Sequence, residues 1–204
     1  CNFKYMKIYE LYVEERFEDL EVCINLGNSA ESVRIFLNKG TAFGSNHPTT
    51  QLSAKAITHL ANNNLDSALD IGCGSGILTI LLLKLGYKIV KSVDIDPFVI
   101  DEAKRNIMSN FEEFPRNLTL SVDEIGQINQ KFDLVVANIS RNFVYNNFKV
   151  ITSLLRGKGY LIISGFNSDD KDKYLSIASK NHMDLVCEFK EKPWISLVFR
   201  KLSF

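Results

Sequence analysis

The stretch Asp70-Ile71-Gly72-Cys73-Gly74-Ser75-Gly76 places three alternating glycines between two apolar segments. Two apolar residues precede it, and residues 77–85, which are almost entirely apolar, follow it. This pattern predicts a strand, a tight turn and the start of a helix. Glycine permits backbone torsions that are closed to other residues, and a helix N-terminus offers free N–H groups to an anionic ligand group. We therefore expect the backbone of this turn, including Gly72, Gly74 and Gly76, to approach a ligand closely.

The charges around the turn favour an adenosine cofactor without phosphate. Asp94 lies 22 positions beyond Gly72, at the end of a second predicted strand, where a carboxylate suits the hydroxyls of a ribose. Ile77 breaks the dinucleotide pattern G-x-G-x-x-G, and no G-K-[ST] follows to make a P-loop. Asp70 would repel a pyrophosphate and attract a sulfonium or an ammonium group. S-adenosylmethionine fits best; the plainer alternative is an ordinary strand–helix turn, and an NAD-dependent enzyme is a distant one.

Composition indicates a globular protein and gives no sign of nucleic-acid binding. The 204 residues suit one domain with a short appendage, and 46% of them are hydrophobic. Lys and Arg total 24, as do Asp and Glu, so no basic excess signals nucleic-acid binding. The four cysteines lack C-x-x-C spacing, which favours a reducing compartment, and no metal-ligand cluster is evident. With no membrane span and no signal pattern, we expect a cytoplasmic location; Cys1 in place of methionine suggests a fragment or a processed chain.

Strand and helix patterns alternate along most of the chain. A helix is predicted at 48–60. Strands are predicted at 67–71, 89–95, 118–122, 132–137 and 160–164, and helices at 76–85, 97–110 (capped by Asp96), 142–155 and 169–181. Two alternating runs, 184–190 and 194–201, read as a hairpin. Repeated β-α units imply a parallel sheet with helices on both faces. The predicted fold class is α/β: a doubly wound, mostly parallel, Rossmann-like sheet of seven strands with a C-terminal antiparallel hairpin.

The N-terminal part of the chain has a different character. Residues 1–43 alternate short apolar and charged pieces, with a strand predicted at 20–26. This segment is too short to form an independent domain without help. We therefore expect residues 1–43 to form an arm or linker packed on the main domain, residues 44–204.

Three segments together resemble the class I S-adenosylmethionine-dependent methyltransferases, namely residues 70–76, 93–97 and 133–139. Residues 42–50 (Ala-Phe-Gly-Ser-Asn-His-Pro-Thr-Thr) and 161–165 (Leu-Ile-Ile-Ser-Gly) narrow the resemblance to the ribosomal protein L11 lysine methyltransferases. The similarity covers roughly residues 40–201. Members of that family also carry an N-terminal domain that recognises the ribosomal protein, and 43 residues are too few for that domain and its linker.

The resemblance implies cofactor contacts at Thr50, Gly72, Asp94 and Asn138. Each has a plainer structural alternative, such as a helix cap for Thr50 or a buried turn for Asn138. The residues themselves suggest two further contacts. Asp70 would orient the loop or the methionine ammonium, and Asp123, after the third predicted strand, would accept from the adenine amino group, although a solvated turn is its simpler role.

The resemblance also implies the reaction, in which a methyl group passes directly from sulfur to an acceptor nitrogen and S-adenosylhomocysteine is the product. Asn138 is the candidate catalytic residue, because its amide can hold the acceptor nitrogen in line. His47 is either a base or a turn residue before Pro48, and Trp194 is expected in the core. The acceptor is expected to be a protein lysine, with a ribosomal protein as the candidate substrate. The alternatives are a small metabolite or peptide as acceptor, and a cofactor-binding module without activity.

Overall fold

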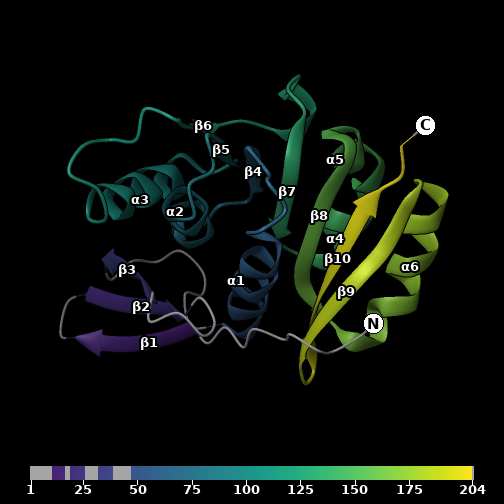
Figure 1. Ribbon diagram of the computed structural model, residues 1–204, viewed down its shortest axis with the longest axis horizontal. Coiled ribbons are helices and arrows are strands. Elements are labelled where there is room, and N and C mark those ends of the chain that lie inside the picture. Colours follow the sequence, from purple (N-terminus) through teal and green to yellow (C-terminus); the bar gives the residue numbers. More distant parts are fainter. Residues whose placement is uncertain (1–10, 17–18, 26–31, 39–46, 204) are drawn as a thin grey trace.

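The computed structural model describes residues 11–16, 19–25, 32–38 and 47–203, which form two sheets (Figure 1). The larger sheet has seven strands in the order β6-β5-β4-β7-β8-β10-β9. Its strands are β4 (Ser67–Ile71), β5 (Ile89–Asp94), β6 (Leu118–Val122), β7 (Phe132–Asn138), β8 (Leu155–Asn167), β9 (Met183–Glu191) and β10 (Trp194–Lys201). Strands β4 to β8 pair in parallel, whereas β10 is antiparallel to both of its neighbours. The predicted fold class is confirmed.

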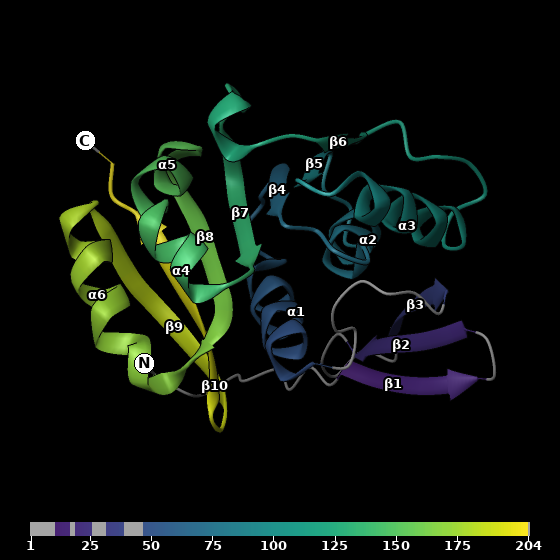
Figure 2. The same cartoon turned by 180° about the vertical axis from the view of Figure 1, so that it is seen from behind.

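Helices cover both faces of this sheet (Figures 1 and 2). They are α1 (Pro48–Leu60), α2 (Ile77–Lys84), α3 (Pro97–Met108), α4 (Arg141–Asn146), α5 (Phe148–Ser153) and α6 (Lys171–Lys180), with 3-10 turns at Ile125–Gln127 and Ser168–Asp170. Successive strand residues point to opposite faces. Val136 accordingly packs in the core with α1 and α2, and its neighbour Val135 packs in the core with α4, α5 and α6.

Side-chain caps set the starts of two helices beside the carboxyl edge of the sheet. Asp96 accepts a hydrogen bond of 2.8 Å from the Phe98 amide, and Pro97 follows it in the first turn of α3. His47 caps α1 in the same way, ahead of Pro48. Proline suits the first turn because its missing N–H has no partner there in any helix. The predicted capping role of Asp96 is confirmed.

The helix predicted at 142–155 is wrong in two respects. Asn147 leaves helical geometry, with φ −107° and ψ 11°, and divides the segment into α4 and α5. Leu155 already belongs to β8, where it pairs with Phe132 of β7. The strand expected at 160–164 therefore begins earlier and includes Gly157 and Gly159. Pairing with a distant strand overrides the local preference here, as is common for strand residues.

The smaller sheet is antiparallel and consists of β1 (Leu11–Arg16), β2 (Asp19–Asn25) and β3 (Ser32–Asn38). It adds two strands to the one expected at 20–26. Ile35 and Leu37 of β3 are buried in the core that contains α2, so this strand is joined to the larger unit. Residues 1–10 and 39–46 lie outside the described part of the chain, and the division at residues 43 and 44 stays a prediction.

Candidate functional site

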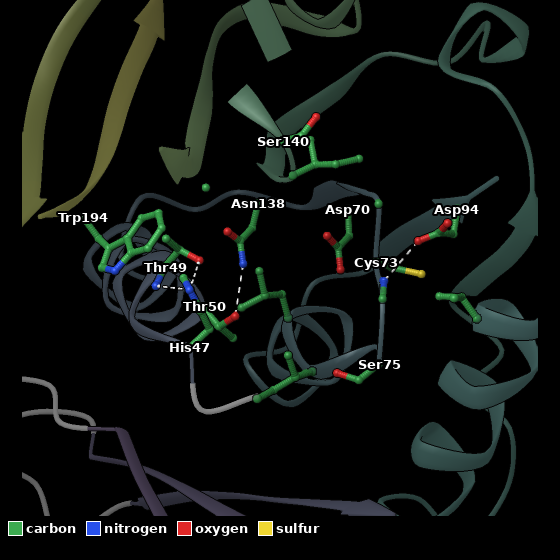
Figure 3. Close-up of a pocket in the computed structure, with 17 residues that line it drawn as sticks. His47, Thr49, Thr50, Asp70, Cys73, Ser75, Asp94, Asn138, Ser140 and Trp194 are labelled. Carbon is green, nitrogen blue, oxygen red and sulfur yellow. Dashed lines mark hydrogen bonds between the residues drawn. The ribbon is translucent and has the colours of Figure 1, made fainter. Parts of the chain in front are cut away.

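A cavity of about 440 Å³ opens at the carboxyl ends of β4, β5 and β7 (Figure 3). Ligands of open α/β sheets bind at this edge. Its wall includes the predicted residues Thr50, Asp70, Gly72, Gly74, Asp94 and Asn138. A second cavity of about 410 Å³ shares Gly72, Asp94 and Ile139 with the first. The structure thus brings most of the predicted residues to one place, with two adjoining cavities around Asp94.

The glycine loop has the backbone that its sequence predicts. Gly72, Gly74 and Gly76 have φ angles of 69°, 54° and 80°, a region that disfavours residues with a Cβ. A Cβ on Gly72 would also lie 2.7 Å from Cδ1 of Ile139, and one on Gly76 would lie 3.2 Å from the Ala103 Cβ. The torsion therefore favours glycine at positions 72 and 76, and a side chain at either would also crowd Ile139 or Ala103.

Asp94 connects the end of β5 to this loop. Its Oδ2 accepts from the Gly74 amide at 3.3 Å, and its Oδ1 accepts from the Asp96 amide at 3.2 Å. The side chain lines both cavities. Asp94 therefore caps the end of β5, and it is also placed to meet a ligand.

Asp70 lies beneath the loop and is 1% exposed. Its Oδ2 accepts a hydrogen bond of 2.7 Å from the Thr79 hydroxyl of α2, and Thr79 lies 2.7 Å from the Ser92 hydroxyl. Burial raises the pKa of Asp70 to about 6, and the nearby Asp94 adds to the rise despite the Thr79 hydrogen bond. A cation in the cavity would favour the ionised form of this carboxyl group.

Asn138 and Thr50 meet although 88 positions separate them in the sequence. The Asn138 Nδ2 donates to the Thr50 Oγ1 at 3.1 Å (Figure 3). Asn138 ends β7, and Thr50 lies in the first turn of α1, where it is 2% exposed. This contact fixes the amide of the candidate catalytic residue at the cavity wall.

His47 and Trp194 form the other end of the cavity (Figure 3). The His47 Nδ1 accepts from the Thr49 amide at 3.3 Å, so His47 has the predicted turn role. Its ring meets the Trp194 ring edge-on, with centroids 4.7 Å apart. The expectation that Trp194 is a core residue is wrong, because β10 inserts next to β8 and brings its first residue to the cavity.

Cys73 and Ser75 of the glycine loop differ in chemical character. Cys73 is buried, and burial together with Asp70 and Asp94 raises its thiol pKa, which disfavours a nucleophilic thiolate. Ser75 is 6% exposed and lines the cavity, but its Oγ has no hydrogen-bond partner among the described residues. No sequence pattern pointed to Ser75 beforehand; its place between Gly74 and Gly76 was the available signal.

Asp123 stands apart from the first cavity and lines the second. Its Oδ2 accepts from Lys91 at 2.8 Å and from Ser121 at 2.7 Å. These hydrogen bonds lower the pKa of Asp123. Half of the carboxylate is thus committed to the protein, and a contact between Asp123 and an adenine ring stays a prediction.

A family model described as "Ribosomal protein L11 methyltransferase (PrmA)" matches residues 3–202. The chain belongs to this family. A ribosomal protein L11 methyltransferase from Dictyoglomus turgidum is 36% identical over 177 residues, which are 85% of this chain and 57% of that relative. One from Staphylococcus saprophyticus is 30% identical over 208 residues, covering 99% of this chain and 60% of the relative. The chain therefore spans about three-fifths of the length of these curated ribosomal protein L11 methyltransferases.

Solved structures agree with the family assignment. A ribosomal protein L11 methylase from Lactobacillus delbrueckii subsp. bulgaricus has a TM-score of 0.74 and 32% identity, covering 81% of this chain and 84% of that one. The N-methyltransferase NodS from Bradyrhizobium japonicum, solved with S-adenosyl-l-homocysteine, shares the fold at a TM-score of 0.59 and 16% identity. The resemblance seen in the glycine loop and the Asn138 segment is confirmed at the level of the family.

The described residues contain neither a membrane-spanning helix nor a cluster of metal ligands. No helix there is both long enough and apolar enough to cross a membrane. No group of three or more His, Cys, Asp or Glu side chains is placed to hold a metal ion within the same residues.

Proposed function

We propose that this chain binds S-adenosylmethionine and transfers its methyl group to a lysine side chain of a ribosomal protein, releasing S-adenosylhomocysteine. Family membership supports the reaction class. The observation that carries the proposal is the meeting of Asp94, Asn138 and the loop residues Gly72–Ser75 at one cavity. The names of the relatives favour ribosomal protein L11 as the acceptor, which would place the reaction in the cytoplasm.

The residues of the cavity fit this donor better than a dinucleotide. Two carboxylates, Asp70 and Asp94, line it, and they would repel a diphosphate while attracting a sulfonium and an ammonium. Gly72 leaves the loop without a side chain where a ligand would pass. The buried Ser75 hydroxyl has no hydrogen-bond partner within the described part of the chain and offers a polar contact. Asp94 ends β5, where a carboxylate can accept from both ribose hydroxyls.

When bound, the donor supplies an activated methyl group whose leaving thioether is neutral. The protein therefore needs to align the acceptor nitrogen and keep its lone pair free, more than it needs a strong acid. The Asn138 Nδ2 is held by Thr50, which leaves the Asn138 carbonyl oxygen to accept from the acceptor N–H. A lysine ammonium must first lose a proton, and partial desolvation in the cavity lowers its pKa and so assists that loss.

Methyl-labelled S-adenosylmethionine, incubated with this chain and purified ribosomal protein L11, tests the proposal. We expect label on lysine and a single-turnover rate that rises with pH through the pKa of the acceptor lysine. Asn138→Ala is expected to lower this rate, whereas the helix-cap variant Asp96→Ala serves as a folded control.

Three other outcomes contradict parts of the proposal. A rate that does not change with pH argues against a lysine acceptor. Label that appears only in molecules of a metabolite extract contradicts a protein acceptor. Tight S-adenosylhomocysteine binding without transfer to either would mean a cofactor-binding module.

A further inference from the structure

Asn106 is a fully buried polar side chain on α3, and both the oxygen and the nitrogen of its amide are hydrogen bonded. Its Oδ1 accepts from the Asn38 backbone amide at 2.9 Å and from the Asn38 Nδ2 at 3.1 Å. Its Nδ2 donates to the Ser75 carbonyl at 2.8 Å. One side chain therefore joins the last residue of β3 to the glycine loop.

The contact with the loop fixes a single peptide unit from two sides. The carbonyl of the Ser75–Gly76 peptide accepts from Asn106, and its N–H donates to the Cys73 carbonyl at 2.9 Å. This peptide carries the Ser75 side chain, whose hydroxyl is buried at the cavity wall and has no partner in the described protein. Loss of Asn106 would leave a buried carbonyl unsatisfied and allow the peptide to turn.

A second asparagine, just beyond the end of α3, offers a matched comparison. Asn110 follows α3 and also holds β3, because its Oδ1 accepts from the Phe36 amide at 2.9 Å and its Nδ2 donates to the Phe36 carbonyl at 2.6 Å. Its further hydrogen bond goes to the Asn106 carbonyl. Asn110 therefore makes direct contact with the strand and none with the loop.

We propose that Asn106 is a positioning residue that couples the packing of β3 against α3 to donor binding. It does so by holding the Ser75 hydroxyl toward the amino-acid end of S-adenosylmethionine or its product. The proposal rests on the proposed function, because it takes this donor as the ligand of the cavity. Coupling between two sites is reciprocal, so donor binding must also stabilise the packing of β3 against α3. The stability of the β3 contact with α3 therefore depends on whether the donor occupies the cavity.

Calorimetric titration with S-adenosylhomocysteine tests the first half of the proposal. We expect Asn106→Ala to raise the Kd about tenfold, since one lost hydrogen bond is worth roughly that factor, and Asn110→Ala to change it less than about twofold. Asn106→Asp keeps the acceptor for Asn38 and removes the donor to Ser75, so it should also raise the Kd. Urea unfolding of each variant shows that it is folded, and Asn106→Asp serves if Asn106→Ala is not.

Two further readouts separate positioning from plain stability. Ser75→Ala should raise the Kd for S-adenosylhomocysteine but not for 5′-methylthioadenosine, which lacks the amino-acid end, and it should not add to Asn106→Asp. Hydrogen exchange at the Asn38 amide should slow when S-adenosylhomocysteine binds the unaltered chain or Asn110→Ala. The same ligand should have little effect on that amide in Asn106→Asp.

The outcomes distinguish this inference from the proposed function. If the unaltered chain binds no S-adenosylhomocysteine, the proposed function fails and the inference fails with it. If the unaltered chain binds it and the Asn106 and Asn110 variants have equal affinities, only the coupling through Asn106 is overturned. Equal losses for both ligands in Ser75→Ala would overturn the contact with the amino-acid end.

Discussion

The Asn138 amide donates a hydrogen bond of 3.1 Å to the Thr50 hydroxyl, which joins the end of β7 to the first turn of α1. The two residues are partners in holding one amide plane at the cavity wall. Their orientation therefore depends on the docking of α1 against the sheet, as well as on the strand itself.

Substitution of this pair is expected to affect methyl transfer more than donor binding. Asn138→Ala should lower kcat about tenfold or more, and Thr50→Val should lower it less, because it leaves the amide present but no longer held. The double variant should lose less than the sum of the two single losses, since both disturb one interaction. Steady-state kinetics with ribosomal protein L11 provide the measurement. Thr58→Val is the control, since the hydroxyl of this buried threonine of α1 bonds, among the described residues, to the Ala54 and Lys55 carbonyls of its own helix.

Asp94→Ala should weaken S-adenosylhomocysteine binding by at least about tenfold, because hydrogen bonds to a charged group are worth roughly 1.5–3 kcal/mol. Isothermal titration calorimetry measures this directly. Asp96→Ala is the comparison two residues away: it removes the cap of α3 and should cost about 1 kcal/mol of unfolding free energy. An unchanged affinity in Asp94→Ala would refute the assignment of Asp94 to the ligand.

Gly72→Ala and Gly86→Ala separate backbone strain from lost space. Both glycines have positive φ, 69° and 86°, so both substitutions should cost roughly 1–2 kcal/mol. A Cβ at Gly86 has nothing within 4 Å, whereas one at Gly72 would lie 2.7 Å from Ile139 Cδ1 at the cavity. We expect S-adenosylhomocysteine affinity to fall only in Gly72→Ala, while urea unfolding shows a loss of stability in both. Equal affinities would mean that the loop does not need this space.

The raised pKa of Asp70 gives a pH dependence with a defined sign. Its folded pKa of about 6 lies above the ordinary aspartate pKa of 3.8, so the folded protein binds the proton more tightly than the unfolded chain. The contribution of Asp70 to stability is therefore most favourable below about pH 4, declines between pH 4 and 6, and is constant above that. Urea unfolding of Asp70→Asn should lack this decline when compared with the unaltered chain. Parallel pH profiles for the two proteins would contradict the assignment.

Local sequence patterns predicted most of the strands and helices, because the same residues are also favoured by packing in the folded protein. The strands at Ser67–Ile71 and Leu118–Val122 were predicted to the residue, and Asp96 and Pro97 marked the start of α3. The segment 142–155 failed because Leu155 pairs with Phe132 across the sheet, a contact that no local pattern contains.

The site was predictable where a chemical group stands at the end of a strand. Asp94 and Asn138 are of this kind, and the three alternating glycines at 72, 74 and 76 predicted the turn. Trp194, Ser75 and Asn106 were not found, because their roles depend on which distant segment faces them. Asn106 in particular is one more polar residue in an amphipathic helix until β3 and the loop are both in place.

The insertion of β10 between β8 and β9 sets an order in time. Both flanking strands precede β10 in the chain, yet β9 reaches the sheet only through it. During synthesis the seven-stranded order can form only after residues through Lys201 have emerged. Trp194, the first residue of β10, is therefore among the last residues to reach the cavity wall.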